Sequence, residues 1–397
     1  MRVLIIGIGI AGSSVAGALR DLEPDSGRLS IDIISRESCA DPEIYGPGWY
    51  EARRIRVRKN CEVVRLDRAK RRIILRYGEE AGYDNLVLCM GADSARPPIP
   101  NSSLEGIFTI REYGDSEALH RQLQAAASQV VVLGGGLRGL EAAHHLLSPG
   151  QRQLAIVEQA PNLLPRLVDE MCAAMLQRLI ERWPCEVLVG TSVAEFLGRG
   201  QVEGVRLTNG LELAAQTVLV STGIRPRVDL AREAGLEVNR GIIVEACLRS
   251  SDPNIFVAGD LVEFEGVVCG TIPAALGHAP VVAHNLLKAE GELLYHQTVP
   301  ESGLKIDGIE LTSIGKVVLD GERGYEVVRR YDNQRECYEK WVFREGRLVG
   351  CLLLGSGANR DFARASIGQE LDPAVALSLP RLAMRAVSEE RQPLPAS

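Results

Sequence analysis

Short runs of predominantly apolar residues recur along the chain, and each run ends at a glycine or at a polar residue. The clearest of them are residues 3–6, 31–34, 130–133 and 154–157. Runs of this length, without the alternation of a half-exposed strand, predict strands that are buried on both faces. A helix is expected over residues 11–21, between the first two runs, so the pattern predicts strand–helix–strand units.

Two of these strands lead directly into the same glycine pattern at the start of a helix. The first copy contains Gly7, Gly9, Ala11 and Gly12, and the second contains Gly134, Gly136 and Gly139. In such a loop the first glycine allows a tight turn, the second lets a pyrophosphate approach, and the third lets the helix pack on the strand. Two such seats in one chain predict two dinucleotides that exchange electrons, a flavin and a nicotinamide.

The residue that ends the second strand of each unit bears on the choice of nucleotide. Glu158 ends the strand at 154–157, and a carboxylate there accepts hydrogen bonds from ribose hydroxyls but repels a 2′-phosphate. No arginine follows at 159–162, so NADH is expected rather than NADPH. The alternative is a surface glutamate that merely ends a strand. In the first unit the aligned position is Ser35, with Glu37 two places later, and these are the candidates for the other ribose.

Composition limits the classes of protein and of site. Hydrophobic residues make up 46% of the 397 residues and charged residues 24%, and no apolar run is long enough to span a bilayer. The nine cysteines include no Cys-x-x-Cys pair, which argues for reduced thiols in the cytoplasm and against an iron–sulfur or other metal site. A net charge of −7 argues against a nucleic-acid-binding surface, and a chain that opens on a core strand is expected to carry no signal peptide.

The charge is unevenly distributed along the chain. Residues 53–76 contain eleven lysines and arginines against only Glu62 and Asp67, so this basic window carries +9 and the rest of the chain −16. One interpretation is a pair of solvated strands whose basic residues prevent edge-to-edge pairing. The other is a surface that steers an acidic partner protein toward the chain.

Further strand ends complete an ordered set of motifs. They are Cys89-Met90-Gly91, Ser221-Thr222-Gly223 with Arg225 and Pro226 after it, and Ala258-Gly259-Asp260. With the tandem glycine loops, they resemble the pyridine nucleotide–disulfide oxidoreductase family, and within it the NADH:rubredoxin, ferredoxin and nitrite reductases.

The resemblance implies an α/β fold of two Rossmann-like dinucleotide-binding domains in the glutathione-reductase-like arrangement. The NAD domain is expected at 113–228, inserted between the two parts of the FAD domain at 1–112 and 229–299. A small C-terminal α+β domain, expected at 300–397, would serve dimer or partner contacts.

The resemblance also implies roles for individual residues. The first glycine loop would hold FAD, together with Gly91, Gly259, Asp260, Ala274 and Ala275, with Asp260 hydrogen-bonding the ribityl or pyrophosphate region. Asp260 could instead cap the following helical segment. The second loop, with Gly223, would hold NADH. Glu141 would lie where the nicotinamide meets the flavin, or would simply be an acidic residue near a helix start.

The chain departs from the family pattern on one side of the flavin. The family's long helix and loop are replaced by the short segment Tyr45–Tyr50, and its flavin-facing lysine and cysteine have no counterpart. Tyr45, Trp49 and Tyr50 could stack on the flavin or could be ordinary packing residues. Cys39 comes too soon after the strand at 31–34 to match the family's cysteine, and Cys89 is expected to be a small buried residue.

These features predict an FAD-dependent oxidoreductase that takes hydride from NADH. The electrons would pass to an acidic redox protein or to a metalloenzyme subunit, with the chain in a homodimer or a hetero-complex. An NADH oxidase and a small-disulfide reductase are disfavoured by the missing cysteine. A flavin-bearing structural or relay subunit of a larger metalloenzyme is the alternative from a different class.

Overall fold

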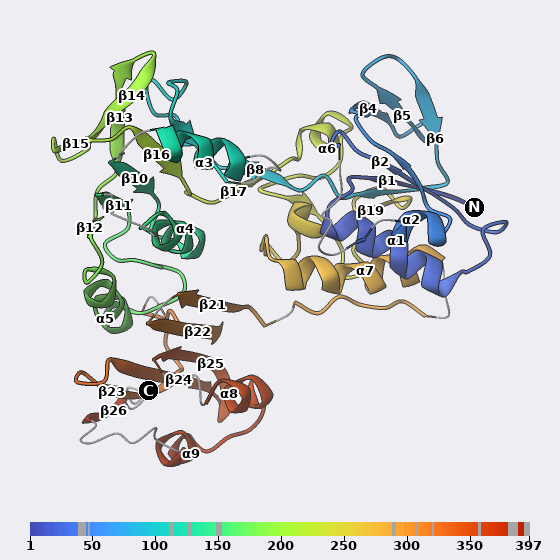
Figure 1. Cartoon of the computed structure of the whole chain (residues 1–397). Coiled ribbons are helices and arrows are strands. Elements are labelled where there is room, and N and C mark those ends of the chain that lie inside the picture. Colours follow the sequence, from blue (N-terminus) through green and yellow to red (C-terminus); the bar gives the residue numbers. More distant parts are fainter. Residues whose placement is uncertain are drawn as a thin grey trace. The chain divides into compact units, whose positions relative to one another are not determined.

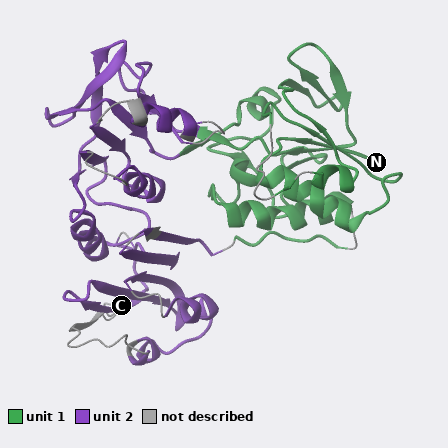
Figure 2. Cartoon of the chain, in the orientation of Figure 1, with its two compact units in different colours: residues 1–93, 224–298 green, residues 94–223, 299–397 purple. Residues whose placement is uncertain are grey.

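The computed structural model describes residues 1–38, 45–46, 48–110, 115–125, 129–147, 153–287, 291–297, 299–306, 308–319, 321–355, 359–379 and 388–392. The chain forms two compact units, each assembled from two separate stretches of sequence (Figure 2). The first unit comprises Met1–Asp93 and Ile224–Thr298, and the second comprises Ser94–Gly223 and Val299–Ser397.

A five-stranded parallel sheet forms the centre of the first unit (Figure 1). In spatial order its strands are β19 (Ile255–Val257), β7 (Asn85–Leu88), β1 (Arg2–Ile6), β2 (Ser30–Ile34) and β3 (Arg56–Arg58). The chain leaves β1 toward β2 on one side, and the sheet continues on the other side with β7. The carboxyl end of β1 is therefore a topological switch point, where ligands bind in sheets of this kind.

Helices α1 (Ile10–Leu22) and α7 (Ile272–Leu287) pack side by side in this unit (Figure 1). Their apolar residues, among them Val15 and Leu19 of α1 and Val282 of α7, share one core with the buried strands. The remaining elements of the first unit and its edge are α2 (Trp49–Ala52), β4 (Val63–Asp67), β5 (Arg72–Leu75), β6 (Glu80–Gly82), β8 (Ala92–Ser94), β17 (Ile224–Pro226), α6 (Asp229–Glu233), β18 (Ile242–Ile243), the 3₁₀ turn η1 (Gly259–Leu261) and β20 (Val262–Glu263).

The second unit contains a second parallel sheet of the same construction. Its strands in spatial order are β12 (Cys185–Val189), β11 (Leu154–Glu158), β10 (Val130–Leu133), β16 (Thr217–Val220) and β9 (Ile107–Phe108). Helices α3 (Asp115–Ala125), α4 (Leu137–Leu147) and α5 (Glu170–Ile180) accompany it, with a three-stranded antiparallel sheet of β13 (Val193–Arg199), β14 (Gln201–Leu207) and β15 (Glu212–Ala214). As with β1 in the first sheet, β10 is central: β11, to which α4 leads, lies on one side of it and β16 on the other.

The C-terminal part of the second unit is a six-stranded antiparallel sheet. Its strands in spatial order are β21 (Glu301–Ile306), β22 (Ile309–Gly315), β25 (Arg347–Leu354), β24 (Cys337–Arg344), β23 (Glu326–Asp332) and β26 (Ser388–Gln392). Strand β24 is buried along nearly its whole length because both faces are covered. Trp341 and Phe343 pack with α8 (Arg360–Ser366) and α9 (Pro373–Ser378), whereas Tyr338 joins the core of the parallel-sheet part.

The predicted α/β class is confirmed: two parallel sheets carry the glycine loops, and the C-terminal part is built on an antiparallel sheet. The insertion is also confirmed. Strands β7 and β19 pair in the first sheet, although the whole second parallel sheet lies between them in the sequence. The bounds of the four expected parts stay predictions: the compact units group the first part with the third and the second with the fourth. Within the described ranges, no helix is long and apolar enough to cross a membrane.

Candidate functional site

The first glycine loop leaves space at one position and none at two others. Gly7 has φ +114°, and a Cβ there would lie within 3.0 Å of the Cys89 carbonyl oxygen. A Cβ on Gly12 would lie within 3.0 Å of the Gly7 carbonyl oxygen. At Gly9, by contrast, no described atom comes within 4 Å of the Cβ position. Gly7 and Gly12 are therefore required for the turn and for helix packing, while Gly9 borders open space.

The second loop repeats this arrangement position by position. Gly134 has φ +115°, and a Cβ there would lie within 3.0 Å of the Ser221 carbonyl oxygen. Gly139 faces the Gly134 carbonyl in the same way, and the Cβ position of Gly136 has no described atom within 4 Å. The chain thus holds two cradles of one design, and each fits the diphosphate of a dinucleotide at its middle glycine.

Both cradles open on the start of a helix. Within the described part of the chain, no side chain caps α1, and neither α1 nor α4 has an acidic residue in its first turn. Their first N–H groups and the positive end of each helix dipole are thus directed at the open space. This arrangement favours an anionic group at Gly9 and at Gly136.

Other segments from the first unit lie at the same edge as the first cradle. Gly259, with φ +77°, follows β19, and a Cβ there would lie 2.8 Å from the Ala11 side chain. Its neighbour Asp260 is therefore brought beside the start of α1. Gly91 follows β7 with φ +66°, and Ala274 and Ala275 are buried in the first turn of α7. The structure thus assembles the predicted residues of this cradle from four separate stretches.

Glu158 lies against the second cradle. One of its carboxylate oxygens accepts a hydrogen bond from Gly135 N at 2.7 Å and the other from Ala160 N at 2.8 Å. The carboxylate is thereby held beside the loop, with lone pairs left for further donors. On the other side of β10, Gly223, with φ +111°, follows strand β16. Glu141 lies half-buried on α4, one turn beyond the loop, and its catalytic role stays a prediction.

The register of the first sheet confirms that Ser35 occupies the position of Glu158. Gly7 N donates to Ile34 O, just as Gly134 N donates to Val157 O. Ser35 is buried, and its Oγ accepts from Glu37 N at 3.1 Å. The Glu37 carboxylate lies 3.8 Å from Arg227, which also donates to Asp93 at 2.5 Å. The sequence did not single out Arg227, since its partners are distant along the chain.

The aromatic residues of the short segment pack against α1. Tyr45 and Tyr50 make hydroxyl hydrogen bonds of 2.6 and 2.7 Å to Ser14 and Ser13. Trp49 lies 3.1 Å from the Cβ position of Gly17. These contacts support the interpretation of ordinary packing over flavin stacking.

Among the described cysteines, none is shown as an activated thiol at the first cradle. Burial raises the pKa of the Cys89 thiol, which confirms it as a packing residue. Cys39 lies outside the described residues. Among those residues, no cluster of three histidine, cysteine or acidic side chains is placed to hold a metal ion.

Sequence reasoning missed His278, whose ring is hydrogen-bonded to the turn η1 that contains Asp260. Its Nδ1 accepts a hydrogen bond from Gly259 N at 3.1 Å, and its ring packs edge-on against Tyr295 at 4.7 Å. The side chain is 2% exposed, and none of the described residues bonds its Nε2. Burial lowers the pKa of His278 to about 4, against the opposing charge of Asp260, so the ring is neutral. A lone histidine in an apolar helix gave no signal of this role.

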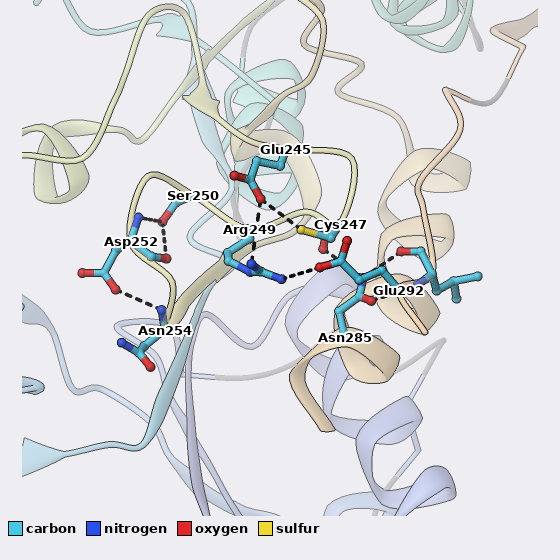
Figure 3. A network of polar contacts seen from close by, with 9 residues as sticks. Glu245, Cys247, Arg249, Ser250, Asp252, Asn254, Asn285 and Glu292 are labelled. Atoms are coloured by element: carbon cyan, nitrogen blue, oxygen red, sulfur yellow. Dashed lines mark hydrogen bonds and ion pairs between the residues drawn. The ribbon is translucent and has the colours of Figure 1, made fainter. Parts of the chain in front are cut away.

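A polar network fixes the loop that leads into β19 and so to Asp260 (Figure 3). Asn285 of α7 donates to the carbonyls of Cys247 and Leu293 and accepts from Leu293 N. Arg249 reaches Glu292 at 3.2 Å and lies over the Phe256 ring of β19. The segment after α7 is therefore attached to the same loop, which secures the turn at Gly259.

Comparison with known proteins agrees with this geometry. Residues 1–279 match the family model described as pyridine nucleotide-disulphide oxidoreductase, and residues 300–364 match the rubredoxin NAD+ reductase C-terminal domain. The chain is 31% identical to a nitrite reductase [NAD(P)H] of Bacillus subtilis over 82% of its length, but spans only 40% of that protein. It is 29% identical to a rubredoxin-NAD(+) reductase of Ectopseudomonas oleovorans, covering 88% of this chain and 94% of the other. A ferredoxin reductase of Rhodopseudomonas palustris, 27% identical, superposes with a TM-score of 0.84 over 95% of this chain and 97% of the other.

The buried His278 predicts an acid-sensitive turn. Its folded pKa is about 4, whereas the unfolded side chain titrates near 6.5, so the unfolded state gains its proton first as the pH falls. The His278 contribution to stability is therefore complete above the unfolded pKa and is lost progressively toward pH 4. At about pH 5 the loss should be about 2 kcal/mol.

His278→Asn keeps an acceptor near Nδ1 but cannot titrate. The free energy of unfolding, measured in urea, falls when the pH is lowered from about 7.5 to about 5. This fall should be about 2 kcal/mol smaller in the variant than in the wild type. Equal losses in the two proteins would contradict a neutral buried ring.

Proposed function

The chain belongs to the pyridine nucleotide-disulphide oxidoreductase family, and we propose that it is an FAD-dependent oxidoreductase that takes hydride from NADH and passes the electrons to a protein acceptor. The observation that carries this proposal is the pair of open glycine cradles, each at the switch point of its own parallel sheet. A chain that bound one nucleotide would need one cradle only.

The first cradle would hold FAD. Gly7, Gly9 and Gly12 shape the seat, α1 directs its N-terminus at the diphosphate, and Asp260 would accept hydrogen bonds from ribityl hydroxyls. When bound, the flavin supplies chemistry that amino-acid side chains lack: it couples a two-electron donor to one-electron acceptors. Ser35 and Glu37 remain the proposed ribose contacts, and Ala274 and Ala275 the close-packed start of α7.

The second cradle would hold NADH. Gly134, Gly136 and Gly139 shape this seat, and Glu158 is fixed beside it by two backbone N–H groups. Its carboxylate would bond the adenosine ribose and repel a 2′-phosphate. Glu158 is thereby proposed as the selector of NADH over NADPH.

For the acceptor we propose a redox protein or a metalloenzyme subunit. The relatives named above are a rubredoxin reductase, a ferredoxin reductase and a nitrite reductase, and the C-terminal match is to the rubredoxin reductase domain. The chain spans about two fifths of the nitrite reductase, so a relay role in a larger complex is the second candidate. The buried Cys89 weighs against an oxidase or disulfide reductase that uses a thiolate.

The basic window gives limited support to steering of an acidic partner. Arg58 pairs with Glu79 at 2.6 Å, and Arg72 and Arg76 pair with Glu80 and Glu62. Arg68 donates to Asp252 at 2.8 Å. Such pairs offset part of the local positive charge, so the steering role stays a prediction. A homodimer or hetero-complex likewise stays a prediction.

The purified chain should be yellow and should reduce ferricyanide with NADH much faster than it consumes oxygen. NADPH should be the poorer donor because of Glu158. A colourless protein that takes up no added FAD would contradict the proposal. Rapid oxygen consumption would favour an oxidase, and the absence of turnover with any dye would favour the relay subunit.

Gly136→Ala should separate nucleotide binding from folding. The new methyl group meets open space in the chain but enters the room needed by the diphosphate, so NADH affinity should fall about tenfold to a hundredfold. Gly139→Ala is the matched control, because its methyl group meets the Gly134 carbonyl and should destabilise the unit by about 1–3 kcal/mol. Thermal unfolding and NADH titration check both; an unchanged NADH affinity in Gly136→Ala would argue against this seat.

The short segment at Tyr45–Tyr50 should leave one side of the flavin accessible. Acrylamide should quench the fluorescence of the bound flavin more strongly in this protein than in a relative that carries the family's long helix and loop beside the flavin. A protein acceptor that covers this side should restore the shielding. A ring that is equally shielded in both proteins would exclude a partner-supplied cover.

A further inference from the structure

The segment that follows Glu158 forms one wall of the second cradle. In this segment, residues 159–169, Leu164 N donates to Gly135 O at 3.0 Å. Leu163 is fully buried, and its side chain lies 2.5 Å from the Cβ position of Gly135. Ala160 N donates to Glu158. The shape of the 159–169 segment therefore determines where Gly135 and the Glu158 carboxylate lie.

The far end of this segment is attached to the six-stranded sheet through Asp169. One carboxylate oxygen caps α5 by accepting from Cys172 N at 3.1 Å. The other accepts from the Tyr338 hydroxyl at 2.7 Å and lies 3.0 Å from Lys340 Nζ. Tyr338 and Lys340 both belong to β24. Lys340 Nζ also donates to Val317 O at 2.7 Å, so the ammonium is fixed from both sides.

This attachment is buried and specific. The Lys340 side chain is 3% exposed and that of Asp169 17% exposed. Burial works against the charged carboxylate, yet Lys340 and the Tyr338 hydroxyl hold the pKa of Asp169 below its usual value. Around the polar contacts, Leu163, Leu164 and Val168 share an apolar core with Tyr338 and Leu352. Removing one partner of such a pair would leave an uncompensated buried charge, so each partner holds the others in this arrangement.

We propose that Asp169, Tyr338 and Lys340 are positioning residues for the nucleotide site, through which the C-terminal sheet sets the affinity for the adenosine half of NADH. This inference rests on the proposed binding of NADH at the second cradle. Tyr338 and Lys340 act on the cradle through Asp169, which ends the 159–169 segment. Their loss should therefore weaken binding of the adenosine diphosphate moiety and leave the reacting end of the nucleotide unaffected.

The probe is ADP-ribose, which carries the adenosine diphosphate moiety but no nicotinamide. Calorimetric titration of the whole FAD-loaded chain should give a Kd about threefold higher for Tyr338→Phe and about tenfold higher for Lys340→Met. In ferricyanide assays, KM for NADH should rise by the same factors with kcat unchanged, because binding lost equally from ground and transition states leaves kcat constant. The flavin content should not change.

Arg182→Ala is the matched control. Arg182, just after α5, donates to Glu336, just before β24, at 2.7 Å, so it joins the same two parts of the chain at the other end of α5. It should lower thermal stability slightly and leave the ADP-ribose Kd unchanged. An effect in Arg182→Ala equal to that in Tyr338→Phe would show a general stability effect and overturn the inference.

Tyr338→Phe decides the matter if Lys340→Met does not fold, since it removes one hydroxyl and no charge. An ADP-ribose Kd equal to the wild type in this variant would overturn the inference while leaving the proposed function intact. A wild-type chain that binds no ADP-ribose would overturn the proposed function, and the inference with it.

Discussion

The close approach of a helix to the strand before it is the constraint on which the rest of this structure depends. At Gly12 and Gly139 the helix backbone comes so near the preceding turn that no Cβ could be accommodated. That contact brings the helix N-terminus to the end of a central strand and leaves the middle glycine facing open space. It also fixes the carboxyl ends of the neighbouring strands beside each cradle, so that Asp260 and Glu158 arrive from segments far away in sequence. Without the contact, the two sheets would have no nucleotide seat.

Local patterns were enough to predict this part of the molecule. Apolar runs indicated the central strands, and the glycine spacing indicated both cradles, because each property depends on residues within about ten positions. The alignment of Ser35 with Glu158 was also correct, since the two sheets have the same register. What these patterns convey is the geometry of neighbours along the chain.

The supporting contacts could not be predicted in this way. His278 bonds a backbone N–H nineteen residues away, and Lys340 reaches an aspartate more than a hundred residues away. Nothing in the sequence near His278, Arg227 or Lys340 distinguishes them from a core histidine or from surface charges, because their partners are chosen by the tertiary fold. The basic window shows the same limit: its +9 charge is correct as a count, but Glu79, Glu80 and Asp252 from outside it neutralise part of it.

The two cradles share one steric design but differ in what surrounds them, and the difference suits two kinds of ligand. The first cradle is flanked by Gly91, the Asp260 turn and α7, and the turn is fixed in place by His278 and the Asn285 network. This enclosure by several elements of one unit suits a prosthetic group that remains bound, even though Ser35 stands where the second cradle has Glu158. The second cradle relies on Glu158 and the 159–169 segment, whose far end is attached to the C-terminal sheet by the contacts of Asp169 with Tyr338, Lys340 and Arg329. A site that must release its ligand in each turnover can be built on fewer contacts, and its affinity can be adjusted at a distance through that one attachment.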